Sequence, residues 1–155
     1  MLTALLTNVT VISAIAAYLA AQLIKLLLVA VREKRFDLNF LVRLGGMPSS
    51  HAATASACAL SVGLRTGFDS AVFAVSFGIV ALVMIDAQSV RRAAGAQARL
   101  LNRLAHNLHP KNEEGPAKLT ESVGHTRTEV LVGAALGVAV AWLTHQVFPS
   151  SAVSP

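Results

Sequence analysis

The sequence has little charge and few aromatic residues. Charged side chains account for 14% of its 155 residues and aromatic side chains for 5%. A soluble domain of ordinary composition carries about 25% charged residues, so this chain lacks the polar surface of a soluble enzyme. Hydrophobic residues instead account for 54% of the chain, and the mean hydropathy is +0.60. This composition is typical of a single membrane domain, and we assign residues 1–155 to it.

Cysteine and long basic runs are also scarce. Cys58 is the only cysteine, which excludes an intrachain disulfide and a thiolate metal cluster, and its small apolar neighbours indicate a packing role. The 13 Lys and Arg residues exceed the 8 Asp and Glu residues, giving a net charge of +5. No basic run exceeds three residues and few aromatic residues accompany the charge. We therefore expect anionic lipid or phosphate as the partner, and no nucleic acid.

Four apolar segments predict helices that cross the membrane. They lack the alternation of strands and are too long for them. Gly133 and Gly137 lie four residues apart in the last segment, as on a helix-packing face. The first segment follows a start without positive charge and indicates a retained span rather than a signal peptide. The predicted spans are residues 9–31, 51–64, 71–86 and 129–147.

A fifth helix is predicted over residues 88–108, where leucines recur at helical spacing opposite basic residues. This pattern favours an amphipathic helix at the lipid headgroups; a linker helix whose leucines pack on the bundle is the alternative. Residues 109–124 are expected to form a loop. The predicted fold class is an all-α integral membrane protein, a bundle of about four transmembrane helices plus an amphipathic interfacial helix. Four short spans around a polar site also favour a homodimer.

The positive charges predict the orientation in the membrane. Arg65 alone belongs to the side that holds both termini, whereas the other 12 basic residues lie toward the opposite side. The positive-inside rule makes that opposite side cytoplasmic. The same face receives the end of the first span, the start of the second, the end of the third and the start of the fourth. Polar residues at these four places are therefore expected to converge.

The run Gly45-Gly46-Met47-Pro48-Ser49-Ser50-His51 opens the second span. Glycines allow close backbone approach, and the N-terminus of a helix offers free N–H groups to an anion, so the run fits a phosphate. The alternative is an ordinary loop in which Ser49 or Ser50 caps the helix and Pro48 lies in its first turn. His51 favours a functional site, because ionisable groups at a membrane boundary are costly.

His125 and Glu129 lie four residues apart and share one face of a helix. The carboxylate would then hold the imidazole in the tautomer whose other nitrogen attacks. A capping box of Thr126 and Glu129 is the competing interpretation, and the two are compatible. Arg91 and Arg92 would bind phosphate oxygens or mark topology. Asp86 is expected to pair with a basic residue rather than to bind a metal.

These segments resemble a known superfamily. Lys25 and Arg32, then Pro48-Ser49-Ser50-His51, then His125 with an acid four residues later resemble the three motifs of the type 2 phosphatidic acid phosphatase and vanadium haloperoxidase superfamily. GGMPSSHAA, DAQSVRRAAGAQARLLN and GHTRTEVLVG resemble its divergent bacterial and plastid branch more closely. The resemblance covers about residues 25–137.

The resemblance implies hydrolysis of a lipid phosphomonoester or diphosphate without metal or cofactor, in the bacterial cytoplasmic membrane. It makes His125 the nucleophile, supported by Glu129, and His51 the proton donor. The phosphate-binding residues that it and the charge pattern suggest are Lys25, Arg32, Arg43, Gly45, Gly46, Ser49, Ser50, Arg91 and Arg92, with Asp86 and Thr126 as support.

The chain departs from the superfamily at several positions. Glu33 stands in place of proline, Ser50 in place of glycine and Glu129 in place of aspartate. The Ser-Arg pair before the nucleophile is absent, since Leu119 stands six residues before His125; we expect Arg91 or Arg92 to replace that arginine.

A membrane lipid phosphatase that faces the cytoplasm is the leading prediction for the function. A non-catalytic binder or carrier of phosphorylated lipids is the alternative, and a small structural membrane protein is a third class. For Arg32, the neighbouring Lys34, Arg35 and Arg43 are alternatives as phosphate ligands.

Overall fold

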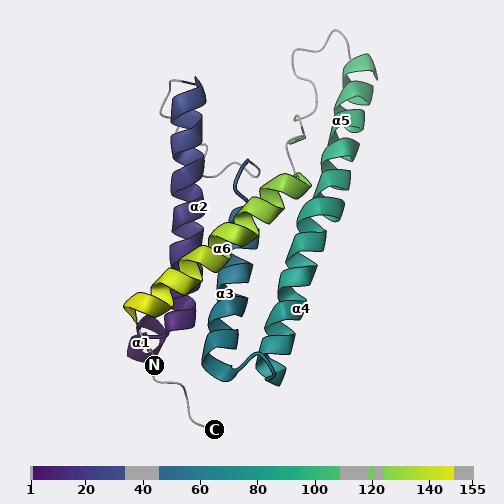
Figure 1. Cartoon of the computed structure of the whole chain (residues 1–155). Helices are drawn as coiled ribbons and strands as arrows, with labels where there is room; N and C mark the ends of the chain where they lie inside the picture. Colours follow the sequence, from purple (N-terminus) through teal and green to yellow (C-terminus); the bar gives the residue numbers. More distant parts are fainter. Residues whose placement is uncertain (1, 34–45, 109–118, 121–123, 149–155) are drawn as a thin grey trace.

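Three helices stand side by side and a fourth crosses them obliquely in the computed structural model (Figure 1). The structure describes residues 2–33, 46–108, 119–120 and 124–148, and this part of the chain is all-helical. The protein is an all-α integral membrane protein, as predicted. Its elements are α1 (Leu2–Leu6), α2 (Val9–Glu33), α3 (Ser50–Thr66), α4 (Ala71–Ile85), the π-helical turn η2 (Asp86–Val90), α5 (Arg91–Leu108) and α6 (Arg127–Val147).

Three of these helical segments are long and apolar enough to cross a membrane. They are residues 9–31, the continuous run 71–107 and residues 127–147. Helix α3 has 17 residues, slightly fewer than the about 20 that the hydrocarbon layer requires. Helices thus form at all four predicted spans, and the crossing of the membrane by α3 stays a prediction.

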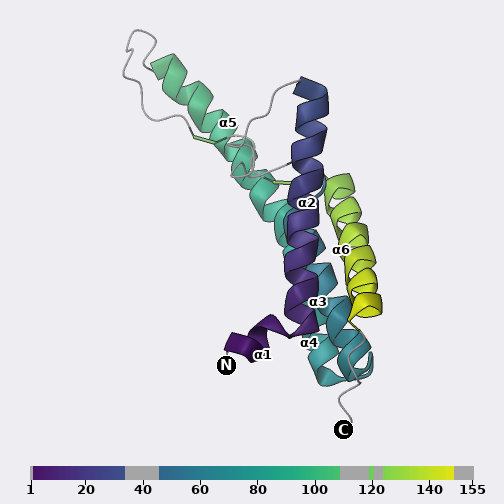
Figure 2. The ribbon, with the colours of Figure 1, turned by 90° about the vertical axis from the view of Figure 1, so that its left-hand side faces the viewer.

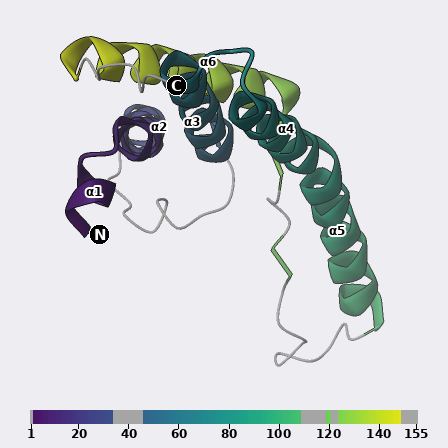
Figure 3. The ribbon, with the colours of Figure 1, turned by 90° about the horizontal axis from the view of Figure 1, so that it is seen from below.

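Helix α3 is the centre of the bundle and packs against α2, α4 and α6 (Figures 1 and 3). Alanine and serine make up 8 of its 17 residues, and such small side chains let neighbouring helices approach closely. The facing side of α2 is buried at every fourth residue. The shared core contains Ala17, Ala21, Ala53, Ala57 and Ala141, all fully buried.

Gly133 and Gly137 lie at a close helix contact, as their spacing predicts. A Cβ at Gly133 would overlap the backbone oxygen of Ser49, and a Cβ at Gly137 would overlap that of Ala53. Helix α6 therefore lies directly on the backbone of the first turns of α3. This contact brings the start of α6 beside the start of α3.

Helix α5 continues α4 through η2 and projects beyond the bundle (Figures 1 and 2). The helix predicted over about residues 88–108 is present as α5 from Arg91 onward, and the π-helical turn joins it directly to α4. Leu100, Leu101 and Leu104 are 60%, 52% and 48% exposed. The leucines do not pack on the described part of the bundle, and a headgroup location for α5 stays a prediction.

The two ends of the bundle differ in what they hold. The start of α2 and the end of α6 lie together at one end (Figure 1). The upper part of α2, the start of α3, the end of α4 and the start of α6 lie toward the other end, as the predicted connectivity requires. The residues of interest gather at this second end.

Candidate active site

The start of α6 holds His125 and Glu129 together. Thr126 caps the helix, and its side chain and that of Glu129 form a capping box. The same Glu129 Oε2 lies 3.1 Å from His125 Nδ1 and accepts a 3.0 Å bond from the Thr126 amide. Glu129 therefore makes both predicted contacts at once, the one with the His125 ring and the one of the capping box. A proton on Nδ1 directed at the carboxylate leaves the lone pair on Nε2, the nitrogen that can attack.

His125 is also fixed through its backbone. Its N–H donates a 3.1 Å hydrogen bond to the carbonyl oxygen of Ala87 in η2. Its side chain is 6% exposed. The ring is thus held between the α4–α5 junction and α6, and π-helical turns often occur at such sites in other proteins. These contacts hold the ring in one position, an arrangement that suits a reacting imidazole.

The start of α3 forms the opposite side of the site. Ser49 caps α3 through a 3.4 Å bond from the Ala52 amide, and Pro48 precedes the cap instead of lying in the first turn. The Ser49 amide donates a 3.0 Å bond to the Glu129 carbonyl. These contacts join the second and third predicted motifs directly.

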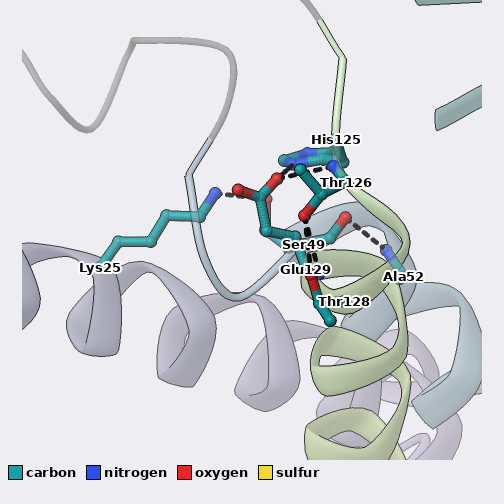
Figure 4. Close-up of polar contacts among 8 residues, drawn as sticks. Lys25, Ser49, Ala52, His125, Thr126, Thr128 and Glu129 are labelled. Atoms are coloured by element: carbon teal, nitrogen blue, oxygen red, sulfur yellow. Dashed lines mark hydrogen bonds and ion pairs between the residues drawn. The ribbon is translucent and has the colours of Figure 1, made fainter. Parts of the chain in front are cut away.

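Lys25 reaches the site from α2 (Figure 4). It is 5% exposed, and its Nζ donates a 3.4 Å hydrogen bond to Ser50 Oγ. Figure 4 shows the side chain pointing toward the carboxylate of Glu129. A buried ammonium beside a hydroxyl and a helix N-terminus is suited to a phosphate oxygen. Lys25 therefore brings the first predicted motif next to the other two.

A cavity of about 230 Å³ lies between the two histidines. Its polar lining residues are His51, Asp86 and His125, and its apolar lining comes from α4 and η2. The cavity thus offers two imidazoles from helix starts that are 74 residues apart in the sequence. Its full lining consists of His51, Leu82, Val83, Asp86, Ala87 and His125.

The other predicted phosphate ligands either lie outside the described residues or do not line the cavity. Arg43 and Gly45 are outside the described residues, as are the alternatives Lys34 and Arg35. Arg32 is the second-last residue of α2 and Arg91 is the first residue of α5, but their side chains are outside what the structure describes. Gly46 has φ +87°, a conformation that glycine adopts without strain, and it leads into the cap of α3. Arg92 is exposed and is not among the described residues that line the cavity.

Sequence reasoning missed two contributors. The Ala87 carbonyl holds His125, and Leu82 with Val83 forms the apolar wall. A backbone carbonyl carries no residue-type signal, and nothing in the DAQSV segment indicates a π-helical turn. Among the described residues, no group of three or more His, Cys, Asp or Glu side chains is arranged to hold a metal ion.

Comparison with known proteins identifies the family of the chain. The sequence model described as the Divergent PAP2 family matches residues 6–140. The chain belongs to the Divergent PAP2 family. It is 37% identical over 145 aligned residues to the uncharacterized membrane protein YuiD of Bacillus subtilis (strain 168), covering 86% of this chain and 92% of that protein. No solved structure matches the chain significantly.

Proposed function

We propose that the protein is a membrane lipid phosphatase that works through a phosphohistidine at His125. The observation that carries the proposal is the 3.1 Å contact between His125 Nδ1 and Glu129, on the wall of a cavity that His51 also lines. Helix capping alone does not require a histidine before the cap. Phosphate binding by a loop alone does not require an imidazole that a carboxylate orients. The pair is what a histidine nucleophile requires.

In the first step His125 Nε2 attacks the phosphorus of the bound ester. A P–N bond forms, the P–O bond to the lipid breaks, and protonated His51 gives its proton to the leaving lipid oxygen. Lys25 and the N–H groups at the start of α3 balance the charge on the phosphoryl oxygens. Glu129 stabilises the positive charge that develops on the His125 ring.

In the second step water attacks the phosphohistidine. Neutral His51 accepts a proton from this water, the P–N bond breaks and inorganic phosphate leaves. The enzyme returns with His51 protonated and His125 neutral. Both steps use the same two imidazoles in alternating proton states, so no further acid or base is required.

The cavity is proposed to face the cytoplasm, because 12 of the 13 basic residues lie toward its side of the membrane. An alkaline phosphatase reporter fused after the last residue checks this orientation in bacteria. The reporter is active only outside the cytoplasm, so activity is expected. A reporter that is silent although the fusion is present in the membrane would reverse the assignment.

The decisive experiment is phosphate release from a panel of lipid phosphates by purified protein in detergent with chelator present. Wild type should turn over at least one substrate, and His125→Ala should abolish turnover. His51→Ala should accumulate an acid-labile phosphoenzyme with a substrate whose leaving group needs no proton. Release that is absent with and without added magnesium, together with retained lipid phosphate binding, would favour a non-catalytic binder or carrier.

A further inference from the structure

A second, larger hollow adjoins the cavity that His51 and His125 line, which we call the active cavity. It is a groove of about 430 Å³ along α3, between α2 and α4. We call it the chain groove. It shares His51 and Val83 with the active cavity, so the two hollows meet at the side chain of His51. Its lining residues are Ala14, Tyr18, His51, Thr54, Ala55, Cys58, Ala59, Ser76, Ile79 and Val83.

The α3 side of the groove is one helical face made of small residues. His51, Ala55 and Ala59 follow at four-residue spacing, and Thr54 and Cys58 complete the stripe. From His51 to Ala59 this face extends about 12 Å along the helix. Helix α6 packs on another side of α3 (Figure 3). Among the described helices, this face is hollow because its side chains are short.

The hydroxyl groups that line the groove are already hydrogen-bonded to other groups of the protein. Thr54 Oγ1 donates a 2.8 Å hydrogen bond to the Ser50 carbonyl, and Ser76 Oγ donates one of 2.8 Å to the Phe73 carbonyl. Tyr18 Oη accepts a 2.9 Å bond from Gln22 Nε2. Polar groups that are already paired place no demand on an occupant. Below His51 the groove therefore presents a surface suited to hydrocarbon.

The groove also opens to the membrane. Tyr18 and Ile79 stand on its α2 and α4 sides and are 44% and 53% exposed. Both lie within apolar segments long enough to cross the bilayer. A molecule in the bilayer can thus enter sideways between α2 and α4 without crossing water.

We propose that the chain groove binds one hydrocarbon chain of the lipid whose phosphate occupies the active cavity, an inference that rests on the proposed function. Because the two hollows meet at His51, the chain must begin close to the phosphate. The substrate class is then a lipid phosphate with its chain directly attached to, or a few bonds from, the phosphoryl group. Any second chain stays outside in the bilayer. His51 stands at the junction, where the leaving oxygen must lie to receive its proton.

The first test uses Cys58, the only cysteine, as a reporter inside the groove. A long-chain alkyl phosphate at ten times its Kd should slow maleimide labelling of Cys58 about tenfold. Inorganic phosphate and the matching alkyl alcohol should slow it far less. The control is Cys58→Ala with Leu23→Cys, which places the thiol at an exposed position of α2 where labelling should not respond. Equal labelling of Cys58 with and without the alkyl phosphate overturns the proposal.

The second test fills the groove with Ala55→Phe and with the milder Ala55→Val. The KM for a long-chain phosphate should rise at least about tenfold in Ala55→Phe, since filling a site costs more than about 1.4 kcal/mol. The value for a short, water-soluble alkyl phosphate should not change. Ala74→Phe, at an exposed position of α4, is the matched control. Equal increases of the KM for the long and the short substrate would refute chain binding in the groove. If no substrate is turned over but the alkyl phosphate still protects Cys58, only the proposed phosphatase activity is refuted.

Discussion

The Ser49 amide donates a 3.0 Å hydrogen bond to the Glu129 carbonyl oxygen, and so the cap of α3 is joined backbone to backbone to the first turn of α6. Glu129 places its carboxylate on His125, while Ser49 precedes Ser50, the partner of Lys25. One contact therefore fixes the position of His125 relative to the start of α3. The close approach that permits it depends on the glycines of α6.

Gly133→Ala should lower stability and activity together. The added Cβ would overlap the Ser49 carbonyl, which is backbone and cannot rotate away, so α6 must move outward. We expect a loss of about 1–3 kcal/mol of unfolding free energy, measured by thermal unfolding in detergent. Gly78→Ala is the control, because a Cβ there meets no atom of the described chain within 4 Å. Equal stability of the two variants would contradict the close contact.

Glu129→Gln separates the structural role of Glu129 from its chemical one. Glutamine also closes a capping box, so the stability of α6 should hold. The negative charge beside His125 is lost, and kcat should fall on the order of 100-fold. Thr126→Ala should do the reverse, costing about 1 kcal/mol of stability with a smaller effect on kcat. Phosphate release and thermal unfolding, measured on both variants, distinguish the two roles. If Glu129→Gln loses stability in proportion to its loss of activity, Glu129 acts only as a helix cap.

Lys25→Met should reduce activity without unfolding the protein. Lys25 is 5% exposed on the buried side of α2, and methionine is an apolar side chain of similar length that can keep the packing there. Losing one charged hydrogen bond to phosphate costs about 1.5–3 kcal/mol, or about 10- to 100-fold in kcat/KM. Steady-state kinetics with a thermal unfolding control measures both effects. An unchanged kcat/KM would remove Lys25 from the phosphate site.

Activity should depend on pH in a bell shape. At low pH a proton on His125 Nε2 occupies the attacking lone pair, and at high pH neutral His51 has no proton for the leaving oxygen. His51→Gln should lower the rate and remove the high-pH decline, while the low-pH decline stays. The profile of kcat/KM for wild type and variant gives the comparison. A wild-type rate that is flat from about pH 5 to 9 would argue against two catalytic imidazoles.

How much the sequence revealed differs between the fold and the site. The apolar segments predicted all four bundle helices, and spacing alone predicted both the glycine contact and the pairing of His125 with Glu129. These features depend on periodicity, which a sequence displays directly. Periodicity does not predict the π-helical turn, the role of the Ala87 carbonyl or the chain groove. A backbone acceptor leaves no residue-type signature, and a hollow depends on which helices stand on either side of a stripe of alanines.

The last prediction concerns the end of the bundle away from the cavity. Ser61 Oγ lies 2.8 Å from His145 Nε2 and donates a 3.0 Å hydrogen bond to Thr10 Oγ1, so three polar side chains join α3, α6 and α2. Ser61 is fully buried. His145→Ala removes a partner from this hydroxyl and should cost about 1–3 kcal/mol of stability.

Because His145 does not line the active cavity, kcat/KM below the unfolding temperature should stay at the wild-type value. Ser61→Ala with His145→Leu replaces both polar partners with apolar groups and should recover part of the stability. Thermal unfolding and phosphate release, measured on the two variants, test whether this polar cluster affects stability without affecting activity. A loss of activity in the folded His145→Ala protein would mean that the two ends of the bundle are coupled.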